Sequence, residues 1–440
     1  MQRRHALYLA FAATLVAMPA SSQQGKNPPT NLYIDVLTHN MAGMPDMGGM
    51  MGGLGGFMAR RAGGDTGKPT YPTTRAGGMT GQYLDIALHN ALKPGVEAQE
   101  QIPSGLKLGK ALTLIPIDPS KPTQGSTPPG KVPDVKIKIT EYWGCGATVR
   151  PGQPKVATFT LKGNGKSVDP NNPMGAMQGM DFSATGSISK QISVADRDID
   201  LKPGWVYWPN IKHGKQVPNG ARLAGEHRIT GDGIPASMQF QVEQAADFMP
   251  KLALRTQGEA TDAIGLSWGA VERARGFHIT GMHMQVLGEN SYAMTMWSSA
   301  EVPGAREDLH TNLTGAQLDK WLKQKVLLPA TATSCTIPKG IFAGSSKVEG
   351  GQDAVMPGML SMTAYGPESW ITYPPKPADP KLPWNPEWSV RFRARSSATA
   401  ILGMDFGDMQ QMDEQDGENP QQQQQKKPGM KSLLKGILGG

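Results

Sequence analysis

The stretch Leu32–Asn40, LYIDVLTHN, sets the fold class because it alternates like a strand with one apolar and one polar face. Tyr33 and Asp35 fall on one parity, whereas Ile34 and Val36 fall on the other. A second stretch, residues 82–90 (QYLDIALHN), repeats the frame of Tyr, apolar, Asp, apolar, two residues, His and Asn. The chain therefore opens with two related predicted strands.

Composition extends this expectation to the whole chain. Of 440 residues, 54 are glycine and 36 are proline, about a fifth of the chain, so turns are over-represented and long helices are not expected. Alternating stretches recur between Pro- and Gly-rich turns, as in VKIKITEYW (135–143) and KVATFTLKG (155–163). We expect a mainly β protein.

Breaks in this pattern divide the chain into predicted segments. The Gly/Met-rich stretch between the two related strands has neither helical nor strand periodicity, and the C-terminal stretch is acidic and then Gln-rich, so both are predicted to be disordered. The expected order is a signal peptide at 1–22, a disordered loop at 41–81, a β-domain at 82–165, a β-segment at 182–248, a β-domain at 249–403 and a disordered tail at 404–440.

The stretch Ile264–Met284, IGLSWGAVERARGFHITGMHM, places Trp268 in a strand, follows it with a turn and opens the next strand on Phe277. Residues 250–300 thereby resemble a fibronectin type III module. The resemblance implies a β-sandwich used for spacing and binding. The expected fold is thus mainly β, with two or three immunoglobulin- or fibronectin III-like sandwich segments.

One short helix is predicted as an insertion in the last β-domain, over residues 314–327. Thr314 can cap its start, and the apolar side chains fall on one helical face. Those apolar residues are Leu318, Trp321, Leu322 and Val326.

The first 22 residues have the pattern of an export signal. Arg3 and Arg4 precede an apolar run of 13 residues, 6–18, and small residues then offer cleavage after Ala20 or Ser22. The run is shorter than the ~20 residues of a membrane-spanning helix. We expect a bacterial envelope protein, periplasmic or secreted, exported by the general or the twin-arginine route.

Charge gives little indication of the partner. The formal charge of +7 falls to +5 once Arg3 and Arg4 are removed with the signal. No Lys/Arg cluster with interleaved aromatics occurs, so no nucleic-acid partner is expected. Near the C-terminus, Met430–Leu438 has apolar residues at helical spacing and lysines on the other face, which predicts either peripheral membrane or partner contact or an unstructured tail.

Cys145 and Cys335 are the two cysteines. In an exported chain such a pair favours a disulfide, which would close a loop of 190 residues and in the chain-entropy model contribute roughly 5 kcal/mol. Two buried thiols, or metal or redox chemistry, are the alternatives.

The short matches to catalytic motifs are excluded by the residues around them. GLSWG (265–269) matches a nucleophile elbow, but its alternation puts Ser267 within a strand instead of a strand-to-helix turn. SISK (187–190) lacks the companion motifs of its enzyme class. We therefore predict a non-catalytic protein with no cofactor.

Methionine supports an alternative to that expectation. The chain has 25, and thioethers select soft ions such as copper(I) and silver(I). Low-complexity drift and core packing are the competing explanations. A hairpin over Phe277–Ser299 would pair two methionines of one strand with two of the next on one sheet face, with His283 and Trp297 opposite. The candidate ligands are Met41, Met44, Met47 and Met50 in the loop, and Met282, Met284, Met294 and Met296 in the hairpin.

Two further groups are candidates for contacts. His39 and His89 end the two related strands and are either metal ligands or local structural residues. Trp205, Tyr207 and Trp208 are the predicted contact surface, because aromatic side chains anchor protein interfaces and sugar rings alike. The expected function is a non-catalytic binding or structural role with an unknown protein or glycan ligand, the alternative being soft-metal binding.

Overall fold

The computed structural model describes residues 27–43, 69–75, 80–117, 134–162, 181–194, 199–306, 309–347, 353–354, 357–379 and 381–402. The predicted signal peptide and its cleavage positions, Met44, Met47 and Met50 in the predicted loop, and the tail with Met430–Leu438 lie outside these residues. None of the helices in the described part is long and apolar enough to cross a membrane.

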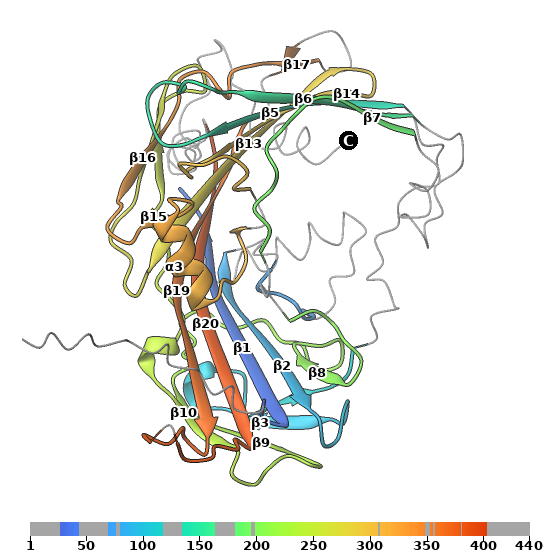
Figure 1. Ribbon diagram of the computed structural model, residues 1–440, viewed down its shortest axis with the longest axis vertical. Coiled ribbons are helices and arrows are strands. Elements are labelled where there is room, and N and C mark those ends of the chain that lie inside the picture. Colours follow the sequence, from blue (N-terminus) through green and yellow to red (C-terminus); the bar gives the residue numbers. More distant parts are fainter. Residues whose placement is uncertain are drawn as a thin grey trace, which may run out of the picture.

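A single large sheet organises the described chain, in the order β7-β6-β5-β14-β13-β19-β20-β1-β2-β8, with β15 also paired to β13. In Figure 1 this sheet bends, so that β5, β6 and β7 cross the top of the view while β1, β2 and β20 run to the bottom. Its strands are β1 (Thr30–Met41), β2 (Gly81–Asn90), β5 (Val135–Trp143), β6 (Lys155–Lys162), β7 (Asp181–Gly186), β8 (Trp205–Trp208), β13 (Gly276–Gly288), β14 (Ser291–Ser298), β15 (Leu328–Pro329), β19 (Met359–Tyr373) and β20 (Trp388–Ile401).

Three smaller sheets accompany it, and a mainly β fold is confirmed. The first has the order β10-β9-β3-β4, from β3 (Ala98–Gln101), β4 (Ala111–Leu114), β9 (Gly225–Gly231) and β10 (Gln239–Val242). The second has the order β11-β12-β16, from β11 (Arg255–Gln257), β12 (Ile264–Ser267) and β16 (Ser334–Ile337). The third pairs β17 (Ser346–Lys347) with β18 (Asp353–Ala354), and two short 3-10 helices span Ser104–Leu106 and Gln244–Ala246.

The two faces of the large sheet differ in chemistry, as the alternation in Leu32–Asn40 predicts. We call one the core face: Ile34 and Val36 of β1 and Phe392 of β20 lie there, in one buried cluster with residues of the β10-β9-β3-β4 and β11-β12-β16 sheets. We call the other the polar face, because Asp35 and Arg393 lie on it. The small sheets therefore cover the core face, and the polar face carries the candidate site.

The last predicted β-domain has sandwich connectivity. Strands β11, β12 and β16 form one sheet in that order, while β14, β13, β19 and β20 are neighbours in the large sheet. Immunoglobulin-type sandwiches pack strands A, B and E against C, F and G with this chain order. The resemblance of residues 250–300 to fibronectin type III modules stays a prediction.

The predicted segments do not form separate sheets. Strands β5, β6 and β7, from segments 82–165 and 182–248, join the large sheet through β14 of the last β-domain. At the other side β1 pairs in parallel with β20 over its whole length, from Thr30 opposite Trp388 to Met41 opposite Thr399. Strands from the beginning, middle and end of the chain thus build one sheet.

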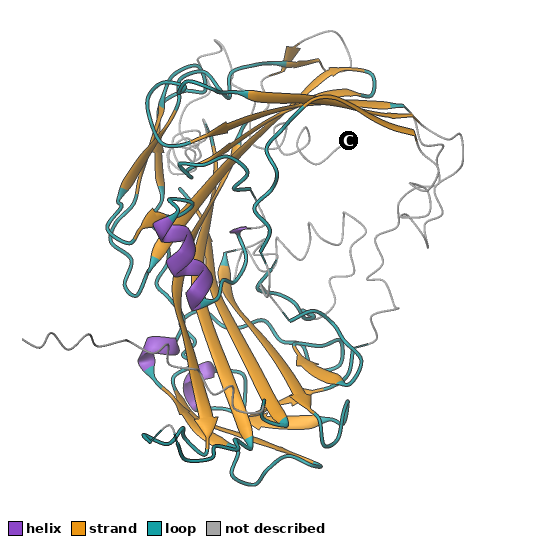
Figure 2. Cartoon of the chain, in the orientation of Figure 1, coloured by secondary structure: helices purple, strands orange, loops and turns teal. Residues whose placement is uncertain are grey.

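The inserted helix is shorter than the predicted 314–327. It is α3 (Gly315–Lys323), which lies beside β19 (Figure 2). Thr314 caps it as expected, in a reciprocal pair with the Gln317 side chain. The helix ends because Lys325 takes a φ of 56°, after which the Val326 N–H returns to the Trp321 carbonyl.

A disulfide joins Cys145 and Cys335, whose Cα atoms are 5.3 Å apart, which is the pairing that the cysteine content favours. Cys145 follows β5 of the large sheet, and Cys335 is a buried residue of β16. The bond therefore fastens the β11-β12-β16 sheet to the strand that extends the large sheet beyond the hairpin.

We expect the double variant Cys145→Ser, Cys335→Ser to lose about 2–5 kcal/mol of unfolding free energy, because its denatured chain is no longer constrained by a closed loop. Urea denaturation of the oxidised protein and the variant measures this. The single variant Ser334→Ala, at an exposed serine beside Cys335, leaves the disulfide intact and serves as a handling control. Equal stability of oxidised protein and double variant would contradict the structural role of the bond.

Candidate ligand-binding face

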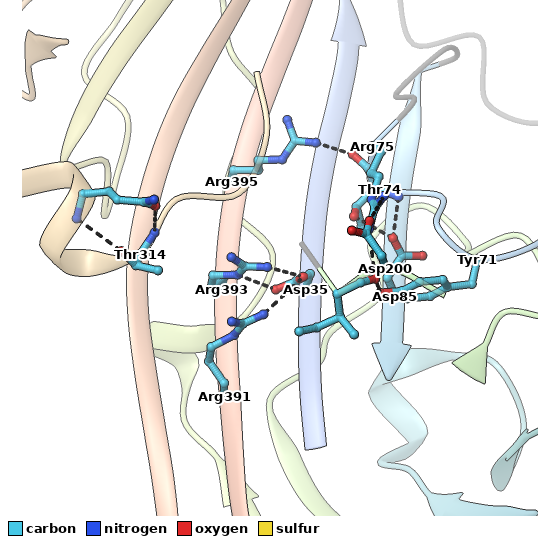
Figure 3. Close-up of polar contacts among 12 residues, drawn as sticks. Asp35, Tyr71, Thr74, Arg75, Asp85, Asp200, Thr314, Arg391, Arg393 and Arg395 are labelled. Atoms are coloured by element: carbon cyan, nitrogen blue, oxygen red, sulfur yellow. Dashed lines mark hydrogen bonds and ion pairs between the residues drawn. The ribbon is translucent and has the colours of Figure 1, made fainter. Parts of the chain in front are cut away.

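A row of charged residues crosses the polar face at its centre. In the strand register Glu368 of β19 lies beside Arg393 of β20, which lies beside Asp35 of β1, and Asp85 of β2 completes the row. The Arg393 guanidinium donates to both carboxylate oxygens of Asp35, at 2.8 and 2.7 Å, and Arg391 Nη2 lies 3.9 Å away (Figure 3). Burial opposes ionisation of Asp35, but Arg393 and Arg391 hold its pKa below the ordinary value.

Asp85 lies directly opposite Asp35 but has different partners. Its carboxyl accepts hydrogen bonds from the backbone N–H and the hydroxyl of both Thr73 and Thr74, at 2.6–2.8 Å. Burial raises the pKa of Asp85 to about 6, although these hydrogen bonds favour the carboxylate. The two acids can therefore be neighbours because arginine neutralises one and a hydroxyl-rich loop surrounds the other.

Two chain segments are fixed over this row. Arg395 donates to the Thr74 carbonyl, and Arg75 pairs with Asp200 at 2.8 Å (Figure 3). The Tyr71 hydroxyl donates to the Ile199 carbonyl. Residues 69–75 and 199–202 are thereby held against the β1 and β2 side of the polar face.

Next to the charged row lies a group of aromatic rings that we call the aromatic strip, comprising Trp370, Tyr33 and Trp205. The Tyr33 ring is 6.4 Å from Trp370, edge to face, and 5.6 Å from Trp205. The Arg391 guanidinium lies 4.6 Å from the Tyr33 ring centre. Trp370 is 52% exposed, and Tyr33 and Trp205 are partly exposed, so a ligand can reach the strip.

Of the three residues of the predicted aromatic contact surface, two are wrong and the third stays a prediction. Trp205 is accessible, but Tyr207 and Trp208 are buried, at 0% and 1% exposure, so they cannot contact a ligand. The Tyr207 ring contacts the tilted ring of Tyr71, with 4.7 Å between ring centres, and Trp208 lies in the core with its indole N–H donating to the His213 carbonyl. Sequence reasoning missed Trp370, which only the pairing of β19 with β20 and of β20 with β1 brings near Tyr33.

The two predicted histidines cannot share an ion. His89 lies opposite Asn31 near the start of β1, and His39 is eight residues further along that strand, which is roughly 27 Å at ~3.4 Å per residue. The His39 ring is hydrogen-bonded to Ser397 at 2.8 Å, and burial lowers its pKa to about 4. The His89 ring stacks on Trp205 at 4.9 Å.

A second histidine pair was not predicted. His278 of β13 and His310 have ring centres 5.1 Å apart, and His310 bridges the hydroxyls of Thr280 and Thr363 at 2.7 Å each. Burial lowers the pKa of both rings, that of His278 to about 3, so both are neutral. Within the described residues no group of three or more His, Cys, Asp or Glu side chains is placed to hold a metal ion.

The register predicted for the methionine hairpin is confirmed: Met282 lies opposite Met296, and Met284 opposite Met294. His283 and Trp297 are buried on the core face, as expected. The pairing of β13 with β19 adds Met359, directly opposite Met282. Met41, the last residue of β1, is partly buried and lies beside Thr399.

We expect Asp35→Asn to lose about 3–5 kcal/mol of unfolding free energy, because Arg393 would be left buried without its counter-charge. Chemical denaturation at neutral pH measures the loss. Asp200→Asn is the matched control, because that carboxylate pairs with Arg75 but is 69% exposed, and it should lose no more than about 1 kcal/mol. Equal losses in the two variants would show that the buried pair has no special role.

Asp85 should make stability depend on pH. Because its folded pKa is about 6 and its ordinary value is 3.8, the folded state binds the proton more tightly than the unfolded chain. This contribution is complete below about pH 4 and is lost as pH rises through about 6. Asp85→Asn cannot ionise, so the stability of wild type relative to this variant should fall by about 2.5 kcal/mol between pH 4 and pH 8. A pH-independent difference in urea denaturation would contradict the raised pKa.

Comparison with known proteins adds no assignment: no protein-family description, no curated protein and no solved structure matches this chain.

Proposed function

We propose that this chain is an exported, non-catalytic binding protein of the bacterial envelope and that its aromatic strip holds a glycan. The observation that carries the proposal is the exposed ring of Trp370, fixed edge to face against Tyr33 at 6.4 Å on the polar face of the sheet. Aromatic faces stack on apolar faces of ligands and contribute most when their own position is fixed.

The surroundings of the strip favour a sugar over a protein surface. The next row of the sheet is polar, with Thr372, Ser389, Asn31 and His89 in register, leading to Trp205. A sugar ring presents apolar C–H faces and hydroxyl edges, so it needs stacking rings and hydrogen-bonding groups side by side. A protein hot spot instead requires a wider apolar surround that excludes water.

The buried charges below the strip supply rigidity. Arg391 is 5% exposed and sits between the Tyr33 ring and Asp35, so the rings rest on a side chain that is itself held. A binding surface organised before the ligand arrives loses less conformational entropy on binding.

Export is supported by the disulfide between Cys145 and Cys335, because such bonds persist in oxidising compartments. The predicted signal at residues 1–22 points to the same compartment. A periplasmic or secreted location would put the strip among envelope glycans.

We expect Trp370→Ala to weaken glycan binding about tenfold, which is about 1.4 kcal/mol, and Trp370→Phe to retain most of it. An array of immobilised bacterial envelope glycans, including peptidoglycan fragments, identifies a binder, and calorimetry with that glycan measures the affinities. Because Trp370 is 52% exposed, the substitution should leave the unfolding free energy nearly unchanged.

Leu382→Ala is the matched control, since Leu382 is also an exposed apolar side chain (53%) but lies outside the strip. The control should bind as wild type does. Binding by Trp370→Ala at wild-type affinity, or no binding to any glycan on the array, would overturn the proposal. Binding of a protein and of no glycan would also overturn the proposal, because the ligand of the strip would then be a protein.

A further inference from the structure

A second surface of the polar face has its own chemistry. Five methionines occupy adjoining register positions on three neighbouring strands: Met282 and Met284 of β13, Met294 and Met296 of β14, and Met359 of β19. We call them the thioether patch. Directly opposite residues in a sheet have Cβ atoms about 4.5–5.5 Å apart, and each methionine has three rotatable bonds beyond Cα. Several sulfur atoms can therefore meet at one point above the sheet.

Burial distinguishes the patch from ordinary core packing. Met362, also on β19, is fully buried on the core face. In the patch Met284 and Met359 are 43% and 49% exposed, Met282 and Met294 are partly exposed, and Met296 is 9% exposed. An ion from solvent can reach the outer thioethers, while the inner one is held by its neighbours.

The electrostatic setting suits a soft, singly charged ion. Ile139 of β5 lies in register beside Met294, and Ile401 of β20 beside Met359. Glu141, in register beside Met296, is buried and already accepts hydrogen bonds from the Ser189 and Gly304 N–H groups and from Arg306. Neutral sulfur ligands in an apolar surround do not compensate a divalent charge, but they suit a polarisable monovalent ion.

The charged and imidazole side chains nearest the patch point to the other face or already have partners: His278 lies on the polar face four residues before Met282, and both ring nitrogens of the neighbouring His310 are hydrogen-bonded to Thr280 and Thr363. Lys136 and Lys138 of β5 alternate with Ile137 and Ile139 and so lie on the opposite face. His283 is buried on the core face, with its ring 6.3 Å from Phe342. The five register positions of the patch therefore offer thioethers alone, which selects against ions that prefer nitrogen or oxygen.

We propose that Met282, Met284, Met294, Met296 and Met359 form a thioether site for a soft monovalent cation, copper(I) or silver(I). This site goes beyond glycan binding and does not depend on it. The folded sheet sets the spacing of the five ligands, so little conformational freedom is lost on binding. Binding is simple coordination, with no change in the oxidation state of the ion.

The experiment uses the whole chain with silver(I) in chloride-free buffer, because silver(I) shares the charge and softness of copper(I). Methyl-13C labelling of methionine gives one signal for each of the 25 residues. Signals of Met282, Met284, Met294 and Met359, assigned with single Leu variants, should shift together at the first equivalent of silver(I). Shifts confined to other methionines, or no shift, would overturn the proposal without any unfolded variant entering the test.

A variant pair then gives the affinity difference. The patch variant Met282→Leu, Met284→Leu, Met359→Leu should bind silver(I) at least about tenfold more weakly than wild type. Leucine has nearly the volume of methionine, so the fold is retained. The matched control Met44→Leu, Met47→Leu, Met50→Leu removes the same number of thioethers and should bind as wild type does.

The patch variant and its control distinguish the two possible locations of the ion. Loss of affinity in the control but not in the patch variant would overturn the proposal and assign the ion to the Gly/Met-rich stretch. Trp370→Ala should bind silver(I) like wild type, so failure of the glycan proposal and failure of the thioether site are seen separately. Copper(I) competition against a chelator of known affinity repeats the comparison with the second ion.

Discussion

The large sheet depends on the pairing of β1 with β20, and the buried ion pair of Asp35 and Arg393 fixes the register of that pairing. The ion pair links the first described strand, β1, to the last, β20, between residues 358 positions apart, with the guanidinium donating to both carboxylate oxygens. A slip of one residue in this parallel ladder would put Asp35 beside Phe392 or Ala394 and turn the core face of β1 toward the polar side. Because an unpaired buried charge is strongly destabilising, the pair specifies register more than it adds stability.

The pairing of β1 with β20 also explains how one face of the sheet can bury so many polar and charged side chains. Strand β19 is long enough to pair with β13 at one end, and at the other end β19, β20 and β1 pack on the β10-β9-β3-β4 sheet. Polar side chains on the outward face find partners in residues 69–75: Arg395 of β20 donates to the Thr74 carbonyl, and Asp85 of β2 accepts from the Thr73 and Thr74 N–H groups. Near α3 the helix N-terminus contributes, because the Gly315 N–H donates to Glu368. Local segments thus satisfy groups that the sheet ladder alone leaves unpaired.

Sequence reasoning succeeded where an interaction is local and failed where it crosses the chain. Alternation placed Asp35 opposite in parity to Ile34, and the short turn after β13 fixed the pairing of Met284 with Met294, because both depend on a few adjacent residues. Nothing local shows that β20 pairs with β1 or that β19 pairs with β13, so the sequence could not predict the partners of Asp35, the place of Trp370 or the addition of Met359 to the patch. The prediction that Tyr207 contacts a ligand was wrong for the same reason, because Tyr71, which is distant in sequence, covers its ring.

The two proposed sites share one face but need not influence each other. Trp370 and Met359 lie on the same strand, eleven residues apart, or roughly 36 Å at ~3.3 Å per residue. Between them the face carries first the row of His278, Thr363, Ser397 and His39 and then the charged row at Arg393. Both imidazoles of the first row are neutral; His39 is hydrogen-bonded to Ser397, and His278 contacts the His310 ring. Coupling between distant sites requires an element with two arrangements that both sites bias. Strands β19 and β20 pair continuously between the two sites, and the buried polar side chains between them already have partners, so this part of the sheet has a single arrangement. Ligands at the aromatic strip and at the thioether patch should therefore bind independently.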